Sequence, residues 1–323
     1  MPRRSPEPAA VFTALALGLA SGACTSASEG GAEPDPAPAG PPQVITLSHP
    51  AAWLVQVLLP TGSADATLLL PKGTDPAAFR PDGAAVARLA EADLLVANGA
   101  GYEAWTETAS LPRQRLVSLA ADVALIESPA HRHSHGDGPA HTHGGPDPHT
   151  WMDPQRYGQG AAALSARLQA LLPADRVEID ARREVLAEKL DELDQALRSA
   201  DGCAKGRRLA ANHPSFTYLA QRLSLDVQVF DLAPDAPPAP QAAAAAQEWA
   251  GDGPRPVLLW EAPPAAEATG ALPAFDHLAL DPLEQPDDSG RYDYLVQAHR
   301  NVAVLQGLCA PAPGASGADD PPR

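Results

Sequence analysis

Residues 44–97 alternate between short apolar runs and stretches with helical spacing. Residues 44–48 form a β-branched run, and residues 51–59 then repeat their apolar positions with the period of a helix. A second strand is predicted at 67–70, a helix at 82–91 and a third strand at 92–97. Strands that alternate with helices predict a parallel sheet with both faces covered.

The middle of the chain is helical for nearly fifty residues. Residues 154–200 show a helical pattern with one break at 171–175. Within 176–199 the apolar positions line up along one stripe, formed by Val177, Ile179, Val185, Leu186, Leu190, Leu193 and Leu197. This stripe predicts a long amphipathic helix.

The rest of the chain returns to the alternating pattern of the first part. Strands are predicted at 208–211, 227–230, 256–261 and 278–281, with helices at 216–223, 241–250 and 292–308. The sequence therefore predicts two α/β halves separated by the long helix. A length of 323 residues and a hydrophobic content of 45% are sufficient for two such domains.

The N-terminus has the features of an export signal over residues 1–24. Arg3 and Arg4 precede an apolar run, and small residues precede Cys24. A cysteine at this place is typical of a bacterial lipoprotein, although Ser21 stands where such signals usually have leucine, and plain cleavage near Ala23 is the alternative. Residues 25–42 are rich in Ser, Gly, Ala, Asp and Pro and predict a disordered tether.

Cysteine count and net charge narrow the environment and the partners. If Cys24 carries lipid, Cys203 and Cys309 are left to form a disulfide in an oxidising compartment, the alternative being two unrelated thiols. The net charge of −17, with no cluster of Lys and Arg, argues against nucleic-acid binding.

Six of the ten histidines lie between His131 and Asp153. Residues 131–143 interleave histidines with small and polar residues, which predicts a flexible loop that collects transition metals or, alternatively, a bland solvated loop. Its members are His131, His133, His135, His141 and His143. The following DPHTWMDP segment, residues 147–154, has two Asp-Pro pairs and a tryptophan, so we expect it to be ordered around His149.

Histidines and carboxylates recur where predicted strands or ordered segments end. They are His49, His149, His213, Glu261 and Asp281. Ligands of open α/β sheets bind at the carboxyl ends of the strands, so these side chains are candidates for one site. Imidazoles with a carboxylate suit a divalent transition metal, above all zinc. A single histidine at a strand end is more often a surface or capping residue, so only the set carries weight.

Several motifs resemble one family over about residues 44–308. They are LAEADLLVANGA at 89–100, DPHTWMDP at 147–154 with the His-rich stretch before it, NHPSFTY at 212–218, and LDPL at 280–283 followed by Tyr292 and Asn301. In order and spacing these motifs resemble the substrate-binding proteins of bacterial zinc and manganese ABC importers.

The resemblance implies a two-lobed, periplasmic-binding-protein-like fold with one metal held between the lobes. Its implied divisions are an N-terminal lobe at 43–172, a rigid interlobe helix at 173–201, a C-terminal lobe at 202–309 and a disordered tail at 310–323. By position, His149, His213 and Asp281 match three of the family's ligands. The His-rich stretch and the Cys203–Cys309 pair resemble zinc-binding members.

One ligand of the family is missing. The family has a histidine in a Gly-x-Asp-Pro-His motif, and this chain has Ala77 at that place, in Gly73-Thr-Asp-Pro-Ala77. His49 is the favoured substitute, while Glu261, a histidine of the loop or a water molecule are alternatives. If none of these groups replaces the missing histidine, the protein has lost a ligand and binds metal weakly or not at all.

The sequence thus predicts a non-catalytic extracytoplasmic receptor, monomeric and lipid-anchored, that captures Zn²⁺ and delivers it to an importer permease with its ATPase. Mn²⁺ and other divalent transition metals are less favoured cargoes. Because the ligands include neutral histidines, capture should weaken as pH falls through about 6.5. The alternatives are a degenerate family member that acts as an adhesin or metal-binding surface protein without transport, and a zinc hydrolase, for which no HExxH motif is found.

Overall fold

The computed structural model describes residues 40–71, 73–74, 76, 78–133 and 141–309. The predicted signal, Cys24, most of the tether, Ala77, His135 and the tail lie outside the described residues, so the predictions about them stay predictions. None of the helices in the described part of the chain combines the length and hydrophobicity that a membrane span requires.

The first lobe is built on a four-stranded parallel sheet in the order β2-β1-β3-β4. The strands are β1 (Gln43–Thr46), β2 (Asp65–Leu68), β3 (Leu94–Ala97) and β4 (Leu116–Ser118), and the helices between them are α1 (His49–Leu58) and α2 (Gly83–Glu91). Every residue of β3 is buried, as expected for an inner strand covered on both faces. Short 3₁₀ helices follow at Ala104–Glu107 (η1) and Arg113–Arg115 (η2).

The second lobe repeats this plan with the sheet order β10-β9-β7-β8, again all parallel. Its strands are β7 (Leu209–Ala211), β8 (Val227–Val229), β9 (Val257–Trp260) and β10 (Asp276–Ala279). Its helices are η5 (Pro214–Phe216), α5 (Thr217–Leu223), α6 (Pro240–Ala250) and α7 (Ala266–Gly270). The inner strands β7 and β9 are wholly buried.

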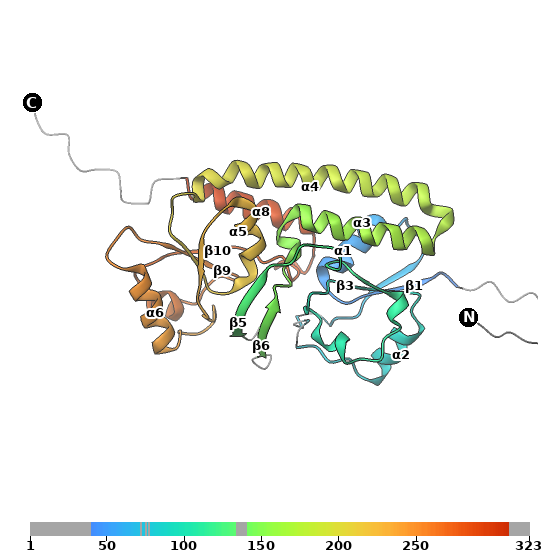
Figure 1. Ribbon diagram of the computed structural model, residues 1–323, viewed down its shortest axis with the longest axis horizontal. Coiled ribbons are helices and arrows are strands. Elements are labelled where there is room, and N and C mark those ends of the chain that lie inside the picture. The colour runs from blue at the N-terminus through green and yellow to red at the C-terminus, as the bar shows by residue number, and fades with distance from the viewer. Residues whose placement is uncertain (1–39, 72, 75, 77, 134–140, 310–323) are drawn as a thin grey trace, which may run out of the picture. The chain divides into compact units, whose positions relative to one another are not determined.

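A layer of helices joins the two lobes. It consists of η3 (Thr150–Met152), α3 (Pro154–Leu171), η4 (Pro173–Asp175), α4 (Arg176–Ala204) and α8 (Tyr294–Gly307). Figure 1 shows α4 running alongside α3, and α4 also packs against α8. The predicted long helix is therefore confirmed.

Two residues of the predicted apolar stripe of α4 were assigned wrongly. Val177 and Val185 are 84% and 53% exposed. The other five residues of the predicted stripe are buried, namely Ile179, Leu186, Leu190, Leu193 and Leu197. These five recur every three, four or seven residues and so share one face, whereas the two valines are displaced from that face.

The buried side chains form one large cluster and two smaller ones. The large cluster contains Val96 of the first sheet, Leu190 of α4 and Leu259 of the second sheet, so it runs from lobe to lobe through the helix layer. A second cluster, around Leu95 and Trp105, lies within the first lobe, and a third, around Trp260 and Phe275, within the second.

A β-hairpin replaces part of the predicted flexible loop. β5 (Glu127–His133) and β6 (His141–Pro146) pair antiparallel, and the register places His131 opposite His143 and His133 opposite His141. The loop prediction was therefore wrong for the described residues of 131–143. That prediction rested on composition alone. Backbone hydrogen bonds between two strands can order a segment even when its side chains have no apolar period.

A disulfide joins Cys203 to Cys309, as predicted. Cys203 lies in the last turn of α4 and Cys309 follows the end of α8, 106 residues later in the chain. The bond therefore ties together the C-terminal ends of α4 and α8.

Candidate metal site

The predicted site residues follow the central strands of the two sheets. In the first sheet β1 has β2 on one side and β3 on the other, and in the second sheet β7 lies between β8 and β9. Such points, where the strand order reverses, open a crevice at the carboxyl ends of the strands. Glu261 directly follows β9, His213 comes two residues after the end of β7, and His49 comes three residues after the end of β1.

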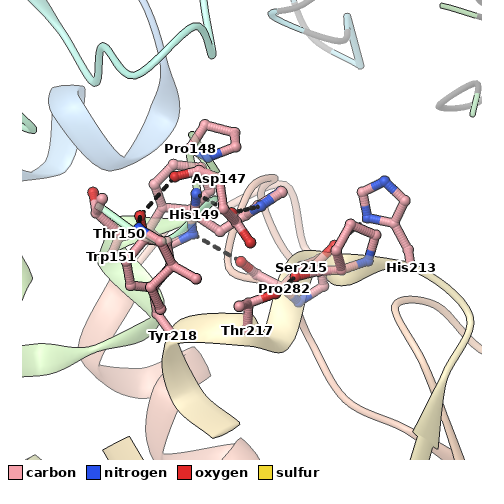
Figure 2. Close-up of polar contacts among 12 residues, drawn as sticks. Asp147, Pro148, His149, Thr150, Trp151, His213, Ser215, Thr217, Tyr218 and Pro282 are labelled. Atoms are coloured by element: carbon pink, nitrogen blue, oxygen red, sulfur yellow. Dashed lines mark hydrogen bonds and ion pairs between the residues drawn. The ribbon is translucent and has the colours of Figure 1, made fainter. Parts of the chain in front are cut away.

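His149 is held by the ordered segment 147–153. Its Nδ1 lies 2.7 Å from Asp147 Oδ1, which also accepts a hydrogen bond from the His149 backbone N–H at 2.9 Å. The segment is fixed by both lobes, since Asn98 Nδ2 donates to the Pro148 carbonyl and the Tyr218 hydroxyl donates to the Asp147 carbonyl. The ring is thereby oriented with its Nε2 free of Asp147 (Figure 2).

The surroundings of His149 are strongly negative. Burial lowers the pKa of His149, but the charge and hydrogen bond of Asp147, followed by those of Glu284, raise it to about 10. Burial raises the pKa of Asp147, and the charge and hydrogen bonds of His149 lower it by more. The two carboxylates therefore favour a cation at this imidazole.

His213 is held from the second lobe in the same way. Its Nδ1 lies 2.6 Å from Ser215 Oγ and 3.3 Å from Glu261 Oε2, and Ser215 Oγ donates to that carboxylate at 3.1 Å. Asn212 Oδ1 accepts from the Glu261 backbone N–H. Glu261, predicted as a possible ligand, therefore lies behind the histidine, on its Nδ1 side.

The two histidines meet across the lobes with a separation that suits a shared metal. Their ring centroids are 5.8 Å apart and the ring planes are nearly perpendicular, at 84°. Two imidazoles bound through Nε2 to one tetrahedral zinc, at about 2.0–2.1 Å each, place their centroids about 5 Å apart, so the rings need to approach only slightly to share the ion. Both Nδ1 atoms contact polar partners, so a metal would bind each ring through Nε2, which in His149 lies 2.9 Å from Glu284 Oε1.

Asp281 lies two residues beyond β10 and is bound by its own loop and by α8. Its Oδ2 accepts from Gln297 Nε2 at 2.9 Å and its Oδ1 from the Leu283 backbone N–H at 2.8 Å. Burial raises the pKa of Asp281, and the negative charge of Glu284 acts in the same direction. Two carboxylates thus lie close enough to repel each other at this end of the second sheet.

Glu284 is a site residue that the sequence analysis did not identify. Its Oε1 lies 2.9 Å from His149 Nε2, and its side chain is 7% exposed. The only sequence signal was a glutamate directly after the LDPL motif.

His49 forms the first turn of α1 and packs on the neighbouring loop of the second lobe. Its ring stacks on Tyr292 with centroids 5.5 Å apart. Its Nε2 is buried and has no hydrogen-bond partner within the described part of the chain. Burial lowers the pKa of His49, which keeps the imidazole neutral and able to bind a metal.

The full predicted ligand set is not assembled. Among the residues that the structure describes, no three His, Cys, Asp or Glu side chains are grouped closely enough to hold a metal ion. His149 and His213 lie together, whereas Asp281 is hydrogen-bonded to Leu283 and Gln297, and His49 is stacked on Tyr292. Ala77 and His135 lie outside the described residues, and only the backbone of His131, His133, His141 and His143 is described, so their predicted roles stay predictions.

Known proteins share this architecture. The zinc(II)-bound AdcA structure from Streptococcus pneumoniae has a TM-score of 0.72 at 23% identity, covering 87% of this chain and 61% of that chain. The metal-dependent lipoprotein YcdH from Bacillus subtilis has a TM-score of 0.69 at 20% identity, covering 82% and 98%. At these identities the likeness supports the two-lobed fold alone, which agrees with the predicted fold class.

Sequence relatives point to the same group. The zinc-binding lipoprotein AdcA of Streptococcus pneumoniae strain R6 is 29% identical over 184 residues, which are 54% of this chain and 36% of the relative. The high-affinity zinc uptake system protein ZnuA of Bacillus subtilis is 24% identical over 202 residues, 60% of this chain and 63% of the relative. The chain thus spans between about a third and two thirds of these relatives.

Residues 44–307 match the family described as "Zinc-uptake complex component A periplasmic". This range contains both sheets apart from Gln43, the helix layer and all the described residues of the candidate site. The chain therefore belongs to the ZnuA family of periplasmic zinc-uptake components.

Proposed function

We propose that this protein is an extracytoplasmic receptor that captures Zn²⁺ between its two lobes and delivers it to the permease of an ABC importer. The observation that carries the proposal is the meeting of His149 and His213 from opposite lobes, with ring centroids 5.8 Å apart. Each ring contacts a polar partner through Nδ1, so Nε2 is the nitrogen through which each would bind the metal. Family membership supports the same cargo and the same kind of partner.

The chemistry of the donors favours zinc over harder cations. Imidazole nitrogen with a few carboxylates suits zinc and its neighbours in the transition series, whereas magnesium and calcium prefer oxygen ligands alone. Asp281 is the proposed carboxylate ligand from the second lobe. His49 is a further candidate donor from the first lobe, because its pKa is lowered by burial and its Nε2 has no hydrogen-bond partner among the described residues.

Calorimetry on metal-stripped protein tests the proposal. We expect tight binding of one Zn²⁺ by the full chain and a loss of at least about tenfold in affinity when His149→Ala and His213→Ala are combined. His299→Ala is the matched control, because His299 is an exposed histidine of α8, and it should bind zinc as the unchanged chain does. Equal zinc affinity of the double variant and the control would contradict the proposal.

The histidines of the His-rich stretch are proposed as an auxiliary collector for the same metal. Replacing His131, His133, His135, His141 and His143 by asparagine should remove weak additional zinc binding while leaving the tight site intact. A calorimetric titration carried past one equivalent of zinc separates the two classes of site. Loss of the tight phase in this variant would instead make the stretch part of the main site.

A receptor of this kind works outside the cytoplasm, and we propose that Cys24 anchors it to the membrane by lipid. The curated relative from Streptococcus pneumoniae is named a lipoprotein. Labelling cells with a radioactive or clickable fatty acid should mark the protein, and Cys24→Ser should abolish the label. An unlabelled but correctly exported protein would show that cleavage near Ala23 releases a soluble receptor.

A second candidate function is a metal-binding surface protein that no longer takes part in transport. The observation in its favour is Ala77, at the place where the family has a histidine ligand. Zinc-limited growth of a strain lacking the protein discriminates between the two functions. A growth defect that the His149→Ala, His213→Ala variant fails to rescue supports the importer receptor, whereas normal growth and zinc uptake support the alternative.

A further inference from the structure

A buried carboxylate outside the proposed ligand set lies in the turn that follows β3. We propose that this residue, Glu103, is a positioning residue for zinc capture and acts on His149 through that turn. The inference rests on the proposed function, because it concerns the same site. Glu103 is 2% exposed, and both of its carboxylate oxygens accept hydrogen bonds from the backbone.

The turn after β3 has a backbone that few residues adopt. Gly99, Ala100 and Gly101 follow one another with φ values of 83°, 52° and 81°, all in the left-handed region. Glycine takes such values freely, whereas alanine is strained there. A strained backbone of this kind persists only where the surrounding structure fixes it.

Glu103 supplies that fixation by binding the start of the turn from its end. Its Oε1 accepts from the Asn98 N–H and its Oε2 from the Gly99 N–H, each at 3.0 Å. The Tyr102 N–H closes the turn by donating to the Gly99 carbonyl at 3.1 Å. Burial raises the pKa of Glu103, and its bonds with the two N–H groups offset only part of this effect. A buried carboxylate is costly unless it is hydrogen-bonded, so these bonds are essential to the turn.

The first residue of the turn holds both neighbours of His149. Asn98 Nδ2 donates to the Pro148 carbonyl at 2.9 Å, and Asn98 Oδ1 accepts from the Thr150 hydroxyl at 3.4 Å. Pro148 and Thr150 flank His149 in the chain (Figure 2). One amide side chain, placed by Glu103 through its backbone, therefore brackets the histidine.

The other end of the turn packs on the His149 ring. Tyr102, the residue before Glu103, is 4% exposed. Its ring centroid lies 6.2 Å from that of His149 and 4.8 Å from that of Trp151. The turn thus contacts the His149 segment at both of its ends, through a polar side chain and through an aromatic ring.

A looser turn would change the direction in which His149 presents Nε2. A metal site needs its ligands held close to the productive geometry by the packing and hydrogen bonds around them. Glutamine at position 103 keeps the size of the side chain but replaces one acceptor oxygen by an NH₂ group, which would face a backbone N–H. One of the two bonds that hold the turn is then lost.

The first test compares Glu103→Gln with Asp82→Asn in zinc calorimetry on the full, metal-stripped chain. Asp82 lies in the same lobe and also accepts a backbone N–H, that of Ala85, but it caps α2. We expect Glu103→Gln to lose about tenfold in zinc affinity, the lower end of the range for residues that orient a ligand. Asp82→Asn should bind as the unchanged chain does. Full zinc affinity in Glu103→Gln would overturn the inference.

The second test asks whether the effect passes through Asn98. Asn98→Ala should also weaken zinc binding, and the combined Asn98→Ala, Glu103→Gln variant should lose less than the product of the two single losses. Losses that multiply would show that Glu103 acts independently of Asn98 and contradict the proposed route. If Glu103→Gln does not fold, Asn98→Ala decides alone, because full affinity in that variant rules the route out.

Nuclear magnetic resonance of the metal-free protein provides a readout at the histidines themselves. In Glu103→Gln the ring nitrogen signals of His149 should shift and broaden, because its ring is no longer held in one orientation. The signals of His213, which Ser215 orients from the second lobe, should stay as they are. Unchanged His149 signals, or equal changes at both histidines, would contradict a positioning role.

The two proposals fail in distinguishable ways. If the unchanged chain binds zinc no more tightly than the His149→Ala, His213→Ala variant, the proposed receptor function fails. If that double variant loses zinc while Glu103→Gln retains full affinity, only the role of Glu103 fails. Circular dichroism of each metal-free variant establishes that a loss of zinc affinity is measured on folded protein.

Discussion

Asp147 and Ser215 stand in the same relation to their histidines. Each lies two residues away along the chain and contacts the Nδ1 atom, at 2.7 Å from His149 and 2.6 Å from His213. A histidine with an occupied Nδ1 presents Nε2 in a fixed direction. The two lobes thus orient their imidazoles by the same local device, one with a carboxylate and the other with a hydroxyl that is itself bound to Glu261.

Removing the carboxylate at position 147 should weaken zinc binding without removing a ligand. Asp147→Asn loses the charge that orients and polarises His149, and such changes typically cost about 10–100-fold in metal affinity. Zinc calorimetry measures the loss, with Asp252→Asn as the control at an exposed aspartate. An Asp147→Asn variant with full affinity would show that the backbone alone positions the ring.

The partners of the histidines differ in how far the sequence predicts them. His149 and His213 were predicted because they lie at the ends of ordered segments and strands, and Asp147 and Ser215 are close enough in sequence for such a search to include them. Glu284 was not predicted because its direction depends on the left-handed backbone of Leu283 and on Tyr292 and Trp151, which are remote in sequence. Such contacts leave no local pattern.

Between elements, an ion pair connects α4 to α5. Asp194 of α4 accepts two hydrogen bonds from Arg222, at 2.6 Å and 2.7 Å, and one from Arg198 at 3.0 Å. The Asp194 side chain is 8% exposed. Burial raises the pKa of Asp194, but the hydrogen bonds and charges of Arg222 and then Arg198 lower it by more, so the net shift is downward.

This downward shift fixes the sign of a pH dependence. A carboxyl with a lowered pKa in the folded state stabilises the protein above its unfolded pKa, about 3.9, and the contribution disappears as pH falls through the folded value. Asp194→Asn should therefore lower the free energy of unfolding by about 1–3 kcal/mol at pH 7 and by less at pH 3. Urea unfolding at both pH values measures the difference. An equal loss at both would assign the effect to packing.

The disulfide between α4 and the end of α8 should make stability depend on redox state. A disulfide typically contributes about 2–4 kcal/mol, and the restriction of the unfolded chain favours the upper part of that range or slightly more for a loop as long as this one. Replacing Cys203 and Cys309 by serine should lower the midpoint of guanidinium unfolding, and a reductant should lower it equally in the unchanged chain. The serine variant should not respond to reductant. A response in that variant would point to a thiol elsewhere.

At the level of elements, segments with an apolar period or a continuous apolar run were predictable, whereas very short or polar strands were not. Helix α4 and the buried strands β3, β7 and β9 follow from apolar periodicity or continuous apolar runs. β4 and the hairpin of β5 and β6 were missed because β4 has only three residues and the hairpin is polar. The edge strand β2 was predicted at 67–70, but it is Asp65–Leu68. The prediction was displaced because Leu69 and Leu70, which are apolar and buried, lie beyond the end of the strand.

Across the whole described molecule, one hydrophobic cluster crosses both lobes through the helix layer. Neither lobe can expose its share of this cluster without also exposing α4. We therefore expect a single cooperative unfolding transition, with tryptophan fluorescence and far-ultraviolet circular dichroism giving the same midpoint in urea. Two separate transitions would show that the clusters private to each lobe, around Trp105 and around Trp260, are sufficient to hold the lobes folded alone.

The position of the disulfide determines when it can form during synthesis and export of the chain. In a chain that emerges N-terminus first, Cys203 is exposed 106 residues before its partner, because Cys309 follows α8, the last helix of the described region. The bond cannot close until both sheets and the helix layer have emerged. Oxidation of the two cysteines is therefore a late step, which stabilises a fold whose elements have all emerged. A chain truncated before α8 would lack Cys309 and would keep Cys203 as an unpaired thiol.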